Sequence, residues 1–169
     1  MTNVEILPVY ALIDYAWATL KSNTNMKESD YNGRIPIIPS AQEPEFTDIN
    51  KPFVVYAWSE GSTNDVTPIR AGQISFVVYG ANDREINTIS NLLVVAFNQW
   101  DISAANINQW AVGGPFSTIR FATTWAGTLD GPTPEQTEGG RVSSVVMIRY
   151  RYITDYDLVN LPGSSPASP

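Results

Sequence analysis

The stretch from Gly72 to Trp100, GQISFVVYGANDREINTISNLLVVAFNQW, changes its hydrophobic period at Gly80. Before Gly80 the residues alternate with period two, and because both faces are largely apolar we expect a central strand. After it, Asn82 and Glu85 have the spacing of a reciprocal N-terminal cap. The apolar residues that follow recur at helical spacing: Ile86, Ile89, Leu93, Phe97 and Trp100. The sequence therefore predicts a strand that runs directly into a core helix.

The N-terminal region predicts a second amphipathic helix followed by an extended arm. Pro8 suits the first turn of a helix and Lys21 its last turn. Between them lies an apolar stripe at helical spacing, formed by Val9, Leu12, Ile13, Ala16, Trp17 and Leu20. Residues 31–51 contain three prolines, each lacking a backbone donor, so we expect an irregular arm in which any strand around residues 34–38 lies at an edge.

Three further strands complete the predicted fold. They are FVVYAW at residues 53–58, STIRFATTW at 117–125 and RVSSVVMIRYRY at 141–152, the last two expected to pair as an antiparallel hairpin. The order helix, arm, strand, strand, helix, strand, strand indicates the α+β class. We expect a mainly antiparallel sheet of about four to five strands with two α-helices on one face, the other face needing a partner. A single domain over residues 1–160 and a flexible tail at 161–169 follow from the composition.

Catalytic chemistry finds little support. The chain has no histidine and no cysteine, so the commonest general base, the thiolate nucleophile and sulfur metal ligands are missing. Its acidic sets, such as Glu43 with Glu45 and Asp155 with Asp157, lack a companion motif and read as solvated loop acids. We expect no enzyme activity, no metal and no cofactor. Apolar runs such as Leu92 to Phe97 are far shorter than the roughly 20 residues of a membrane-spanning helix, so we expect no membrane.

Five tryptophans are divided between core and surface positions. Trp17, Trp100 and Trp125 stand on apolar stripes, where packing in the core explains them. Trp58 ends a predicted strand and Trp110 lies in a predicted loop. These two are the aromatic candidates for an interface.

Arg149 and Arg151 project from one face of the last predicted strand, and Arg120 can join them from the neighbouring strand. Two interpretations remain open for these arginines. They can form a solvated sheet face, or they can pair with acidic residues of an adjacent subunit, because guanidinium groups suit ion pairs at interfaces.

The segment between the last two strands, AGTLDGPTPEQTEGG, is longer than a hairpin connection requires. It carries Asp130, Glu135 and Glu138 but lacks the ligand spacing of an EF-hand calcium loop. These acids are further interface candidates, and solvated loop acids are the alternative. The formal net charge of the chain, −7, argues against binding DNA as a ligand, whereas it suits a channel through which DNA slides.

In the order of their elements and in their residue pattern, these segments resemble the tail-terminator or neck-terminator proteins of tailed bacteriophages. The likeness covers residues 5–157 and is carried by a helix ending near Leu20, KPFVVYAW, GQISFVVYGANDREINTISNLLVVAF, STIRFATTW and SSVVMIRYRYITDY. The resemblance implies a virion protein, assembled in the host cytoplasm, that forms a hexameric ring on the tail tube. Such a ring stops tube growth and joins the tail to the head. The implied partners are other copies, the tail tube protein and the head–tail connector, with DNA passing through the lumen.

The resemblance further implies that the second sheet face and its arginines contact neighbouring subunits. The arm at residues 31–51 and the loop at 127–140 would then reach the tube, the connector or the lumen. Three alternatives remain. The first is another neck component or the tube protein itself, and the second is a carbohydrate-binding module using Trp58, Trp110 and tyrosines on an exposed sheet. The third is a hydrolase that relies on acidic residues alone, with Glu135 and Glu138 as its main candidates.

Overall fold

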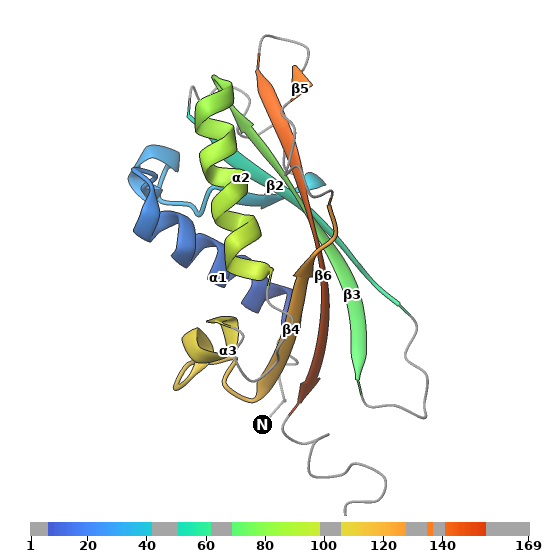
Figure 1. Ribbon diagram of the computed structural model, residues 1–169. Coiled ribbons are helices and arrows are strands. Elements are labelled where there is room, and N and C mark those ends of the chain that lie inside the picture. The colour runs from blue at the N-terminus through green and yellow to red at the C-terminus, as the bar shows by residue number, and fades with distance from the viewer. Residues whose placement is uncertain are drawn as a thin grey trace, which may run out of the picture.

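The computed structural model describes residues 7–41, 51–61, 69–98, 106–127, 135–136 and 141–154. These residues form one mixed, mainly antiparallel sheet with three α-helices on one side of it (Figure 1). The α+β class and the order of the main elements are those that the sequence predicts. The predicted tail at 161–169 lies outside the described residues.

The sheet places its longest strands at the centre. In spatial order the strands are β1 (Ile37–Pro39), β2 (Phe53–Glu60), β3 (Arg70–Gly80), β6 (Val142–Thr154) and β4 (Ile119–Trp125). A two-residue strand, β5 (Glu135–Gln136), pairs with the start of β6. The predicted central strand and the predicted antiparallel pair, β4 with β6, are confirmed. β1 is an edge strand, as expected, and pairs in parallel with β2.

The helices are α1 (Pro8–Asn23), α2 (Asp83–Phe97) and α3 (Asn106–Ala111). At the start of α2 the Asn82 side chain accepts a hydrogen bond from the Glu85 backbone N–H at 3.0 Å. The return bond differs slightly from the predicted cap, because the Glu85 carboxylate accepts from the backbone N–H of Ala81 at 3.3 Å. α2 ends at Phe97, and Trp100, predicted to extend its stripe, lies outside the described residues.

The core lies between the sheet and these helices. Alternate residues of the central strands face the helices and are fully buried: Ile74, Phe76, Val78, Val146 and Ile148. The apolar stripes predicted for the two long helices cover them, with Leu12 and Leu20 from α1 and Ile86 and Leu93 from α2 buried in turn. Trp17 is buried and Trp125 packs against the core, as predicted.

Two predictions about local structure need correction. Residues 31–41 of the expected arm do not extend away, because Tyr31, Ile37 and Ile38 are buried and the Tyr31 hydroxyl donates to the carbonyl of Pro52. Residues 42–50 lie outside the described ranges. Trp110 lies in α3 and not in a loop. A helix of six residues is too short to show a hydrophobic period, so no sequence pattern indicates it.

The outer edge of β4 is closed by side chains. The Asn108 amide donates to the carbonyl of Phe121 and accepts from its N–H, both at 2.8 Å. These are the two bonds that a neighbouring strand would make. Further along, the Asn98 side chain accepts from the N–H of Trp125 at 3.3 Å. The outer edge of β4 is therefore covered at Phe121 and at the N–H of Trp125.

Replacing Asn108 with alanine should destabilise the fold. Asn108 is buried, so its loss leaves the N–H and the carbonyl of Phe121 without partners, which costs roughly 2–4 kcal/mol. Chemical denaturation measures the change in the free energy of unfolding. Asn98→Ala, at an exposed and longer bond, is the control and should cost under about 1 kcal/mol. Equal losses in the two variants would contradict this role for Asn108.

Candidate interface on the open face of the sheet

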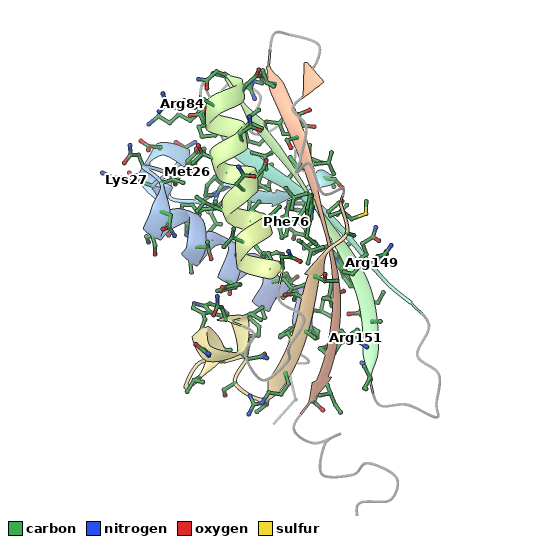
Figure 2. All side chains as sticks on the ribbon, viewed as in Figure 1. Met26, Lys27, Phe76, Arg84, Arg149 and Arg151 are labelled. Atoms are coloured by element: carbon green, nitrogen blue, oxygen red, sulfur yellow. The ribbon has the colours of Figure 1, made fainter. Side chains whose placement is uncertain are left out.

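One face of the sheet has no described helix on it, and we call it the open face (Figure 2). The strand register brings matching rows of residues together across this face. Gln73 of β3 lies opposite Arg149 of β6, which lies opposite Thr124 of β4. The next row holds Ala71, Arg151 and Ala122. Half of this face is therefore built from polar and small residues around two arginines.

The other half of the open face is buried. Near the start of β2, Phe53, Val55 and Ile38 are almost inaccessible. The Phe53 ring stacks on Tyr79 with centroids 5.1 Å apart, and the Arg141 guanidinium lies 5.2 Å from its centroid. The expectation that the whole second face needs a partner is therefore too broad. We call the part that carries Arg149 and Arg151 the accessible half; at its border Val145, in the same row as Val55, is 52% exposed.

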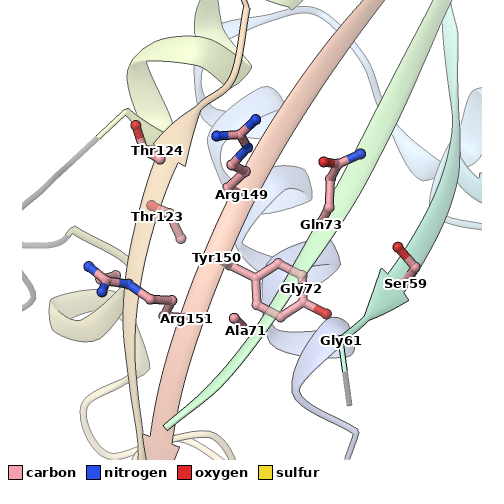
Figure 3. A pocket seen from close by; sticks show the side chains of 11 residues that line it. Ser59, Gly61, Ala71, Gly72, Gln73, Thr123, Thr124, Arg149, Tyr150 and Arg151 are labelled. Atoms are coloured by element: carbon pink, nitrogen blue, oxygen red, sulfur yellow. The ribbon is translucent and has the colours of Figure 1, made fainter. Parts of the chain in front are cut away.

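The accessible half is hollowed, with a volume of about 480 Å³ (Figure 3). Residues of four neighbouring strands line it, including Ser59, Gln73, Thr124, Arg149 and Arg151. Gly72 contributes only backbone to this surface, because a side chain there would point toward Tyr150 on the helix side. A hollow of this kind can receive a side chain from a partner, whereas a flat face cannot.

Arg149 and Arg151 are exposed, and within the described part of the chain neither has a hydrogen bond or an ion pair. Arg120 shares their face, as predicted, but it is half-buried and its guanidinium donates to the carbonyl of Ser117 at 2.8 Å. Arg120 thus serves the local structure before β4. Val145, which is 52% exposed, and Met147 share the face of the arginines, as the alternation of the strand predicts, but the sequence did not single them out as interface candidates.

The remaining predicted interface residues lie elsewhere. Trp58 is 40% exposed but lies opposite Ile74, on the face that carries the helices. Trp110 is 38% exposed on α3, and its ring contacts Tyr15 and Phe116. Glu135 forms part of β5, opposite Ser143. Asp130 and Glu138 lie outside the described residues. The structure therefore brings together the arginines but not the tryptophans.

Behind the hollow, on the side of the helices, Glu60 accepts hydrogen bonds from Tyr150 at 3.2 Å and from Tyr152 at 3.3 Å. Burial, and then the nearby Glu60 carboxylate, raise the pKa of Tyr150 well above its usual value. Burial likewise raises the pKa of Tyr152. Both phenols therefore stay neutral near pH 7 and act as hydrogen-bond donors, not as acid–base groups.

The chemistry available to this surface is the binding of anions. Two free guanidinium groups suit carboxylates, which they can bind through paired hydrogen bonds. In the ranges that the structure describes, no three acidic residues cluster in a way that could hold a metal ion.

Gly72 should tolerate no side chain. A Cβ there would lie 2.5 Å from the Tyr150 hydroxyl oxygen and 2.7 Å from the Ser59 carbonyl oxygen. We expect Gly72→Ala to lower the free energy of unfolding by about 1–3 kcal/mol. Gly61→Ala is the matched control, because its nearest contact would be an ordinary 3.7 Å, and it should stay within about 1 kcal/mol of the wild type. Thermal denaturation of both variants measures the two changes in stability. Unchanged stability of Gly72→Ala would refute the close packing around Gly72.

Comparison with protein-family models and with curated proteins gave no match to this chain. None of the helices in the described part is both long and apolar enough to cross a membrane.

Proposed function

We propose that this chain is a structural protein of a tailed-bacteriophage neck. It forms a ring at the head-proximal end of the tail tube, ends tube growth and joins the tail to the head connector. The observation that carries the proposal is the accessible half of the open face, with its hollow and two arginines that have no partner among the described residues. The order of the elements, which resembles tail terminators, supplies the biological setting. The activity is assembly, without turnover of a substrate.

The distribution of charge favours contacts between copies. All ten lysines and arginines lie in the described ranges, together with seven of the seventeen acidic residues. The other ten acidic residues lie between or beyond these ranges, where there is no basic residue. Each copy thus carries a basic surface and an excess of acid, so copies can attract one another. The net charge of −7 still disfavours binding of the DNA that would pass through the ring.

The closed edge of β4 also bears on how copies meet. Because Asn108 occupies the backbone groups of Phe121, joining sheets edge to edge at β4 is disfavoured. Contact through faces is one remaining route, beside the other edge of the sheet at β1. A ring needs two unlike patches on each subunit, related by a rotation that closes, and the open face supplies one of them.

Purified protein should form a discrete closed oligomer. Light scattering and native mass spectrometry give the number of subunits, which the resemblance leads us to expect to be six, and negative-stain images should show rings. Open-ended cylinders would instead indicate the tube protein. A protein that stays monomeric at high concentration would contradict the proposal.

A carbohydrate-binding module is the competing function. It would use Trp58 and Trp110, yet Trp58 is on the helix side of the sheet and Trp110 packs on Tyr15 and Phe116. Neither lines the hollow. A glycan array that shows binding, lost in Trp58→Ala, would favour the module over the ring.

A further inference from the structure

Helix α1 carries a carboxylate, Asp14, that has no partner among the described residues. Asp14 is partly buried, and the described residues provide it with neither a hydrogen bond nor an ion pair. Its neighbours one turn away along the helix are Tyr10, Ala11, Trp17 and Ala18, none of them charged. Burial raises the pKa of Asp14 above its usual value, in keeping with a charge that has lost hydration without compensation.

Asp14 belongs to the outward side of α1. It lies one turn from Tyr10, which is 48% exposed, and two turns from exposed Lys21. α1 packs on the helix side of the sheet, whereas Arg149 and Arg151 project from the opposite side (Figure 2). Within the described residues, one molecule thus presents a carboxylate without a partner on one side and two guanidinium groups without partners on the other.

We infer that Asp14 of one copy binds Arg149 and Arg151 of the next, so that α1 docks on the accessible half of the open face. The inference rests on the proposed self-assembly and names its contact. Two guanidinium groups can satisfy both carboxylate oxygens. Tyr10, beside Asp14, supplies an aromatic side chain for the 480 Å³ hollow. Because the two patches differ, each copy can bind the next in the same way. The copies form a closed ring when the rotation between neighbouring subunits adds up to a full turn.

The first test reverses the charge of the arginines. Arg149→Glu with Arg151→Glu should raise the dissociation constant of the assembly at least about tenfold, measured by light scattering over a concentration series. Lys27→Glu with Arg84→Glu is the matched control. Both of these cations are exposed, unpaired in the described ranges and remote from the open face, and the change in net charge is the same. Equal weakening by the two pairs would overturn the inference.

The second test separates assembly from folding. Asp14→Asn removes a poorly hydrated charge, so the thermal stability of the isolated subunit at pH 7 should stay the same or rise. Its assembly should nevertheless weaken at least about tenfold, which a folding defect cannot explain. Asp83→Asn removes an exposed acid at the start of α2 and should leave assembly unchanged. Full assembly of Asp14→Asn would refute the contact.

A third variant tests direct pairing. Asp14→Arg combined with Arg149→Glu and Arg151→Glu restores opposite charges and should recover assembly relative to the arginine double variant. Failure to recover would count against direct pairing. The outcomes also separate the two proposals: a monomeric wild type removes the proposed function, whereas a ring that ignores all these changes removes only this contact.

Discussion

Phe97 holds the layers of this molecule together. It is fully buried in the last turn of α2 and stacks on Phe76 of β3 with ring centroids 5.8 Å apart. Its ring also lies perpendicular to that of Tyr15 from α1, with centroids 5.4 Å apart. One side chain thereby joins the central strand to both long helices. Since α2 follows β3 directly, this packing lays α2 on the side of the sheet toward which Phe76 points. The helices gather there, and part of the other side is left accessible.

The elements with a clear period could be predicted from the sequence. The change of period at Gly80 located a strand and the helix after it. The alternation in residues 117–125 and 141–152 located the two strands of an antiparallel pair. These patterns are visible because each element buries one side. α3 and β5 are too short to show a period. The parallel pairing of β1 depends on contacts with β2 that no local pattern encodes.

The candidate surface was only partly predictable. Alternation on β6 placed Arg149 and Arg151 on one face, but whether a guanidinium is free depends on its surroundings, and Arg120 proved to be bound to Ser117. Trp58 was assigned to an interface by its position at a strand end, while its face is set by pairing with β3. Asp14 could not be identified as an interface residue from the sequence. Acidic residues are common on amphipathic helices, and only the structure shows which partners the described residues provide.

The Asn108 side chain at the edge of β4 affects how a single, unassembled copy behaves in solution. Unpaired strand edges promote non-specific aggregation when a protein is present at high concentration. With Phe121 already occupied by Asn108, a newly made copy can accumulate in a crowded cell without recruiting stray strands along that border. Under the proposed assembly, copies would meet through surfaces of matched charge and shape, which are more selective than an unpaired backbone edge.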